Sequence, residues 1–154
     1  MKGTAHIRFM RPGMLRVSGR SMFGSEYDMV SNGKTTEVNA GGTWEPQPSA
    51  ELGIAAITGI SGNAGTYVPT TLVHASYVSI STLMPDAKVT KETVNDVPTF
   101  HAKLRGPASV DFWINAKTYF IVKSSMTVGT TSIVVIYDTP LVNYPIPVKV
   151  FKKS

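Results

Sequence analysis

The chain has 154 residues, with 15 lysines and arginines, 10 aspartates and glutamates, and a formal net charge of +5 at pH 7. This length suits one domain with a single core, and the lack of cysteine excludes disulfides, thiolate catalysis and cysteine-based metal sites. The basic residues are scattered along the chain without interleaved exposed aromatic residues, so we expect no binding to nucleic acid.

Short stretches of alternating apolar and polar residues, separated by turn dipeptides, predict a mainly β protein. Residues 4–10 alternate, and Pro12-Gly13 follows as a turn. Asn32-Gly33 is an expected hairpin turn with positive φ at both central residues, and Asn95-Asp96 is a further turn. A second strand is expected to begin at residue 14, and a short strand is expected at Trp44. The other expected strands cover residues 26–31, 35–39, 78–83, 88–94, 98–104, 109–114, 119–128, 131–138 and 148–152. About ten strands at hairpin spacing indicate an antiparallel sheet with local connections.

Residues 49–76 interrupt the strands and form the only segment with a helical pattern. One helix face is expected to carry Leu52, Ala55, Ala56, Gly59 and Ile60. Pro69 fits the first position of a second short helix. Such an insert fits ordinary core helices and equally a cover for an apolar ligand site. The predicted fold class is therefore mainly β, with a curved, unclosed antiparallel sheet (a half-barrel) and a short helical insert that covers its concave face.

No stretch approaches the roughly 18 consecutive apolar residues of a membrane-spanning helix, so we expect no membrane span. The first residues, MKGTAHIRFMRPG, contain basic side chains without the continuous apolar segment of a signal peptide. We therefore expect no signal peptide in this chain.

The order and spacing of four segments resemble a known family. They are RPGMLR at residues 11–16, YDMVSNGK at residues 27–34, DFWINAKT at residues 111–118 and NYPIP at residues 143–147. Together they resemble the LolA/LolB-like superfamily of bacterial envelope carriers, and within it most closely the outer-membrane-lipoprotein-sorting relatives. The resemblance spans nearly the whole chain and implies one domain over residues 1–154. The family normally has a helix before its first strand, whereas this chain is expected to enter a strand almost directly.

The resemblance implies a non-enzymatic carrier or receptor for lipid or for lipoprotein acyl chains, located in the bacterial periplasm. Its partners would be a lipid or an acylated lipoprotein, together with a membrane-associated protein, and no cofactor or metal is expected. The alternative is a protein-interaction or envelope-stress sensory module on the same fold. The residues expected to line the apolar cavity, which equally fit an ordinary core, are Phe9, Leu15, Val17, Leu52, Ile57, Ile60, Leu72, Phe112, Phe120, Val122 and Val135.

Patterns typical of catalysis are scarce. His6, His74 and His101 lie on separate predicted elements without metal-ligand spacing, and each is expected to be a surface or structural histidine. Asp111 and Asp138 are an acidic pair that neighbouring strands could bring together. A pocket in which a histidine and two carboxylates converge would favour a hydrolase. Without such a pocket, the sequence predicts a protein that is not an enzyme.

Overall fold

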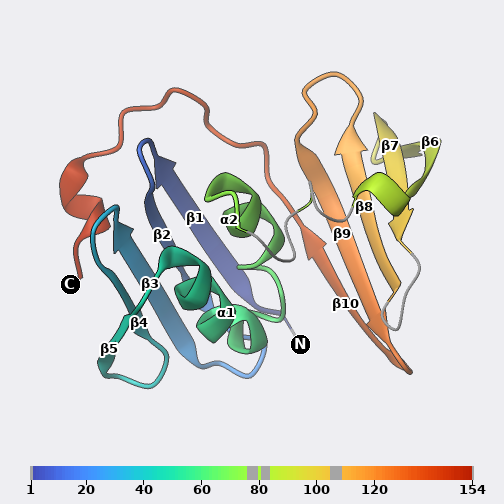
Figure 1. Cartoon of the computed structure of the whole chain (residues 1–154). Helices are drawn as coiled ribbons and strands as arrows, with labels where there is room; N and C mark the ends of the chain where they lie inside the picture. The colour runs from blue at the N-terminus through green and yellow to red at the C-terminus, as the bar shows by residue number, and fades with distance from the viewer. Residues whose placement is uncertain (1, 76–79, 81–83, 105–108, 154) are drawn as a thin grey trace. The chain divides into compact units, whose positions relative to one another are not determined.

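A computed structural model describes residues 2–75, 80, 84–104 and 109–153, and the chain divides into two compact units (Figure 1). Unit 1 consists of Met1–Thr82 and Pro145–Ser154, and unit 2 of Leu83–Tyr144. The strands form two antiparallel sheets of five strands each, and neither sheet closes on itself. The mainly β class with unclosed antiparallel sheets and a short helical insert is confirmed. The strand expected at residues 78–83 falls outside the described residues except for Ile80.

Unit 1 is built on a meander in which each strand pairs with the next along the chain. Its strands are β1 (Thr4–Met10), β2 (Met14–Arg20), β3 (Glu26–Asn32), β4 (Thr36–Asn39) and β5 (Trp44–Gln47). The bounds of β1 match the predicted strand, because the alternation ends where Pro12-Gly13 forms the turn. Pro46 lies within β5, which is an edge strand and therefore tolerates a residue without an N–H group.

The loop between β3 and β4 differs from the predicted two-residue turn. The strand β3 ends at Asn32 and β4 begins at Thr36, so the loop contains three residues, 33–35. Only Gly33 has a positive φ, of 86°. The Oδ1 atom of Asn32 instead accepts hydrogen bonds from two backbone N–H groups of the loop, each at 2.9 Å. An asparagine side chain thus closes the loop without a left-handed conformation of its own residue.

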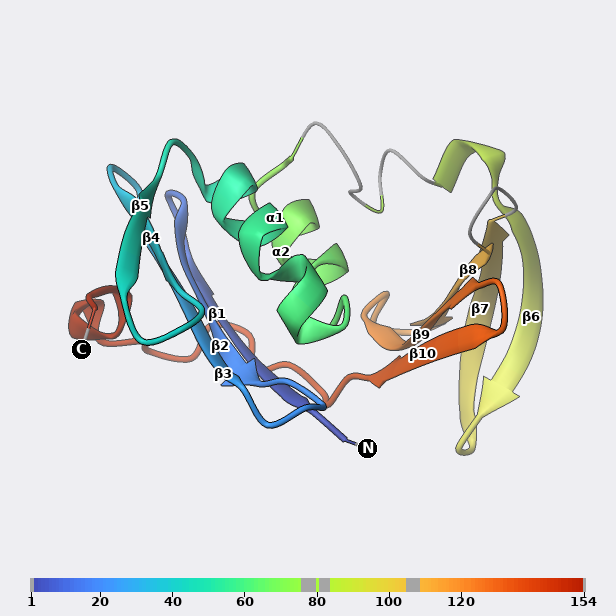
Figure 2. The ribbon, with the colours of Figure 1, turned by 90° about the horizontal axis from the view of Figure 1, so that it is seen from below.

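The predicted insert forms two helices, α1 (Ala50–Ser61) and α2 (Tyr67–Leu72), which lie over the same face of the β1–β5 sheet (Figures 1 and 2). Ser49 caps α1 by accepting a hydrogen bond from the N–H of Leu52 at 3.2 Å, and Gly62 ends the helix in the left-handed conformation. Pro69 is the third residue of α2, two positions later than predicted. The first turn of a helix still suits proline, because an N–H there has no partner within the helix. Among the described residues, no helix has the length and apolar character needed to cross a membrane.

The helix α1 packs onto the sheet through Ile54 and Ile57, which the sequence pattern places on a second apolar side, beside the expected face of Leu52 and Ile60. Its buried residues are Gly53, Ile54 and Ile57, whereas Leu52 is 47% exposed and Ala55 is also exposed. The apolar stripe of this helix is so broad that periodicity alone does not select one face. The sheet selects the face of Gly53, Ile54 and Ile57, because the glycine permits close approach and the two isoleucines fill the space between the layers.

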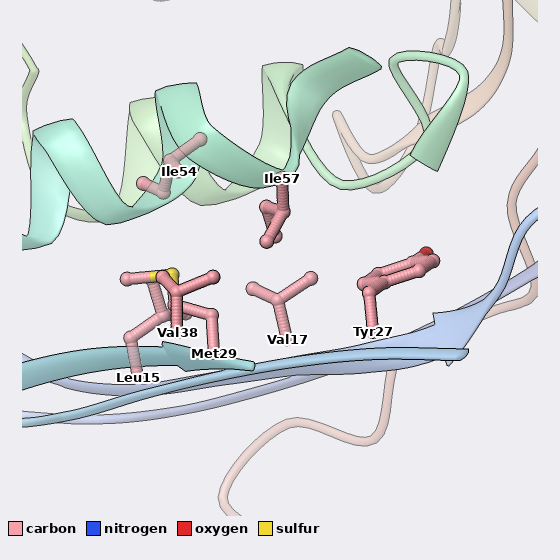
Figure 3. Packing of buried hydrophobic residues seen from close by; sticks show 7 residues of the cluster. All are labelled: Leu15, Val17, Tyr27, Met29, Val38, Ile54 and Ile57. Carbon is pink, nitrogen blue, oxygen red and sulfur yellow. The ribbon is translucent and has the colours of Figure 1, made fainter. Parts of the chain in front are cut away.

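Close approach of α1 to the sheet depends on Gly53. A Cβ atom at this position would lie 2.8 Å from Cγ2 of Thr36 and 3.0 Å from Cε of Met29. Figure 3 shows Ile54 and Ile57 pointing from the helix toward the side chains of the sheet. The sheet side of this core consists of Leu15, Val17, Tyr27, Met29 and Val38. These contacts form the main apolar core of unit 1.

The opposite face of the sheet holds the C-terminal segment (Figure 2). The strand expected at residues 148–152 is wrong, since a 3₁₀ turn, η2 (Val148–Phe151), is present and contacts β2 and β3. Phe151 is 1% exposed. Arg16 forms an ion pair with Asp28 and donates from Nη1 to the carbonyl of Val150 at 3.0 Å. Because an arginine from the sheet face binds this backbone, the segment docks as a turn and does not extend the sheet edge.

Unit 2 is a second antiparallel meander. A 3₁₀ turn, η1 (Met84–Asp86), precedes β6 (Lys88–Val94), β7 (Val97–Leu104), β8 (Ser109–Asn115), β9 (Ile121–Val128) and β10 (Thr131–Ile136). Asn95 and Asp96 both have positive φ, of 48° and 63°, and join β6 to β7 as the predicted two-residue turn. The sheet is visibly curved (Figure 2).

We predict that the C-terminal segment stabilises unit 1 mainly through Phe151. Phe151→Ala should lower the free energy of unfolding by about 3 kcal/mol, because it removes a fully buried aromatic ring. Urea denaturation followed by the fluorescence of Trp44, in a Trp113→Phe background, measures this change in unit 1. The matched control is Val148→Ala, in the same turn but 56% exposed, and equal stability of the two variants would contradict the prediction.

Candidate functional site

A pocket of about 660 Å³ lies in unit 1 at one end of the β1–β5 sheet. Four segments form it, namely the β1–β2 turn, the β3–β4 loop, the start of α1 and the end of α2. Its apolar lining comes from Phe9, Pro12, Pro48, Ala50, Leu72 and Val73, and its basic lining from Arg11, Lys34 and His74. None of the described residues that line this pocket is an aspartate or a glutamate.

The pocket lies at this end because the two hairpin turns of the meander converge there. A Cβ atom on Gly33 would lie 3.2 Å from the carbonyl oxygen of Pro12. Ser31 and Thr36, at the ends of β3 and β4, are buried, and the hydroxyl of Thr36 donates to that of Ser31 at 3.1 Å. The hydroxyl groups of these two lining residues are therefore paired with each other.

The apolar wall of the pocket continues the core of unit 1. Phe9 and Val73 are half-buried and pack against the core cluster. Leu72, at the end of α2, is also half-buried. Phe9 and Leu72 are the two predicted cavity residues that line this pocket.

The other predicted cavity residues of unit 1 lie elsewhere. Leu15, Val17 and Ile57 are fully buried in the core between α1 and the sheet, where they fill space. Ile60 is half-buried against the same core, and Leu52 is exposed on the far face of α1.

The remaining four predicted cavity residues belong to unit 2. Phe112 is fully buried, and the strand register places it on the same face of the sheet as Val122 and Val135. Phe120 precedes β9 and is 38% exposed. The prediction thus grouped residues from two units, and within unit 2 the structure brings three of them to one sheet face.

Sequence reasoning missed Arg11, Lys34 and His74 as pocket residues. A signal for two of them was present, because the first and third turns of a meander lie at the same end of the sheet. Arg11 and Lys34 belong to those two turns and could have been placed together from topology. No comparable signal identified His74, which depends on how α2 packs.

A second group of polar side chains lies on the sheet of unit 2. His101, on β7, has its Nδ1 atom 2.6 Å from Oε1 of Glu92 and its Nε2 atom 2.8 Å from Oδ1 of Asp111. Its side chain is 9% exposed. His101 therefore cross-links β6 and β8 across β7.

Trp113 completes this group. Its ring stacks on the imidazole of His101 with centroids 4.3 Å apart, and its indole N–H donates to Oε2 of Glu92 at 3.0 Å. The Nζ atom of Lys123 lies 4.1 Å from the centre of the indole ring. Hydrogen bonds from His101 and then from Trp113 hold the pKa of Glu92 below its ordinary value.

This geometry does not match the acid–base site of a hydrolase. Both ring nitrogens of His101 face carboxylates, so neither is left to take a proton from a nucleophile. A cavity of about 360 Å³ beside the group is lined by Glu92 but by neither His101 nor Asp111. Asp111 and Asp138 are not on neighbouring strands, because Asp138 follows the end of β10 and β9 lies between β8 and β10. Within the described ranges, no cluster of histidines and carboxylates could hold a metal ion.

A scan against protein-family models and searches of curated proteins and of solved structures each found no match. The resemblance to the LolA/LolB-like superfamily, and the single domain that it implies, remain predictions from the sequence.

We predict that Glu92 makes unit 2 sensitive to acid. Its pKa is lowered in the folded protein, so its contribution to stability is present above the ordinary value of 4.5 and is lost as pH falls through the folded pKa. Glu92→Gln should therefore flatten the loss of stability below about pH 4.5. Urea denaturation at several pH values, followed by Trp113 fluorescence in a Trp44→Phe background, measures this. Asp138→Asn, at an exposed position of unit 2, is the control. A full acid-dependent loss in Glu92→Gln would contradict the prediction.

Proposed function

We propose that this protein is a non-enzymatic binding or carrier protein for lipids or for the acyl chains of lipoproteins. The observation that carries the proposal is the pocket of unit 1, whose volume of about 660 Å³ is that of a typical small-ligand site. Its apolar wall, including Phe9 and Leu72, can contact an alkyl chain.

Binding of this kind needs little specialised chemistry. Each buried methylene group of a ligand contributes about 0.8 kcal/mol, so an alkyl chain of modest length offsets the cost of association. A carrier therefore needs shape and apolar area, and no constellation of catalytic residues. The polar group around His101 is explained without catalysis, because it cross-links three strands of unit 2.

The sequence resemblance extends this proposal to location and partners. It supports a periplasmic protein of the bacterial envelope, whose ligand is delivered by or passed to an acylated lipoprotein or a membrane-associated protein. These parts of the proposal rest on the segments at residues 11–16, 27–34, 111–118 and 143–147.

We predict that affinity rises with the length of a single alkyl chain. Decanoate, dodecanoate and tetradecanoate should bind with dissociation constants that fall about fourfold for each added methylene, which corresponds to about 0.8 kcal/mol. Isothermal titration calorimetry below the critical micelle concentration measures the constants. Lack of binding by all three probes would overturn the proposed function, and an affinity independent of chain length would exclude an apolar tail site.

We predict that binding of an alkyl chain depends on the apolar residues that line the pocket, and not on exposed apolar residues outside it. Leu72→Asn should weaken dodecanoate binding about tenfold, because the amide has no partner against the alkyl chain. Leu52→Asn is the matched control, since Leu52 is 47% exposed on α1 and does not line the pocket. Circular dichroism and urea denaturation confirm that both variants fold. Equal binding by the two variants would remove Leu72 from the site.

A further inference from the structure

We propose that the pocket of unit 1 selects amphiphiles with an anionic head group, and that Arg11 and Lys34 bind this head group beside the apolar wall. The inference rests on the proposed function, because it names the ligand class of the same pocket. The shared chemistry is a carboxylate or a phosphate joined to a single alkyl chain.

The charged side chains among the described residues that line the pocket are all basic. Arg11 comes from the β1–β2 turn and Lys34 from the β3–β4 loop, and both side chains are exposed at the pocket. Neither forms an ion pair with a residue that the structure describes. Among the other basic residues of unit 1, Arg16, Arg20 and Lys153 form ion pairs with Asp28, Glu26 and Glu37. Two basic side chains that converge without a carboxylate produce a local positive potential that favours an anion.

The two basic side chains suit the head group in different ways. The guanidinium of Arg11 can donate two parallel hydrogen bonds to a carboxylate or a phosphate, and the ammonium of Lys34 acts as a compact positive charge. Phe9, Leu72 and Val73 lie in the same pocket and supply the apolar contact for the chain. A head and a tail are thus accommodated by residues of one pocket.

His74 adds an independent observation at the same pocket. It follows α2 with a φ of 53°, and its N–H donates to the carbonyl of Thr71 at 3.3 Å, while the N–H of Ala75 donates to that of Thr70 at 2.9 Å. This is the helix-ending motif in which glycine is usual at the left-handed position. A histidine there is strained relative to glycine, and the same residue lines the pocket. We assign the His74 side chain as a further hydrogen-bond donor to the head group.

Calorimetry with four probes that share a dodecyl chain tests the inference. Dodecanoate and dodecyl phosphate are anionic, dodecyldimethylamine oxide is neutral at slightly alkaline pH, and dodecyltrimethylammonium is cationic. At low salt, at least one anionic probe should bind about tenfold tighter than the neutral one, as charge-assisted hydrogen bonds allow. Added sodium chloride should reduce that difference. The anionic probe that binds more tightly identifies the head group.

Two double variants distinguish the effect of the pocket residues on this preference from the effect of the net charge of the protein. Arg11→Gln with Lys34→Gln should abolish the preference for the anionic probe over the amine oxide. Arg8→Gln with Lys152→Gln is the control, because it removes the same charge from exposed residues of unit 1 that do not line the pocket. This control should keep the preference in full.

Each outcome is distinguishable. Equal affinity of all four probes would overturn the anionic selection and leave the proposed function intact, whereas no binding by any probe would overturn both. An equal loss of preference in the two double variants would show that net charge, and not the pocket, is responsible, which overturns the inference.

The variant His74→Gly tests the role of the histidine. Glycine relieves the left-handed conformation, so the variant should be at least as stable as the parent protein in thermal denaturation. Its preference for the anionic probe should nevertheless fall. An unchanged preference would overturn the assignment of His74.

Discussion

Unit 1 depends on the close packing of α1 against the β1–β5 sheet. Gly53 permits the approach because any larger residue would overlap the side chains of Thr36 and Met29. Ile54 and Ile57 then fill the space between the layers. The helix α1 starts at the end of the sheet where the β1–β2 turn and the β3–β4 loop lie. Its packing therefore also determines the position of the pocket.

The two faces of this sheet are stabilised by different means. The face under α1 is apolar, whereas the other face carries the ion pair of Arg16 and Asp28, and its arginine also binds the carbonyl of Val150. Phe151 is buried in the C-terminal turn. The sheet of unit 1 is thereby covered on both sides by segments far apart in the chain, and its pocketed end stays free of acidic lining residues.

A histidine and two carboxylates converge in unit 2. Such a group resembles a catalytic site, but here it links neighbouring strands. His101 lies between Glu92 and Asp111, and Trp113 stacks on the imidazole. Three strands contribute to this group, so it is formed only when the register of β6, β7 and β8 is correct. Convergence of a histidine and two carboxylates is therefore compatible with a protein that binds without catalysing a reaction.

Local patterns in the sequence determined the strand bounds of β1, the Asn95-Asp96 turn and the presence of the helical insert, because alternation, turn chemistry and helix capping act over a few residues. Tertiary structure decided which face of α1 is buried, that residues 148–152 form a docked turn, and that Arg11, Lys34 and His74 line one pocket. The sequence alone could not decide which face of α1 is buried, because the stripe of this helix is apolar on several sides. Contacts such as the one from Arg16 to Val150 also join residues far apart in the chain, and only packing in three dimensions brings them together.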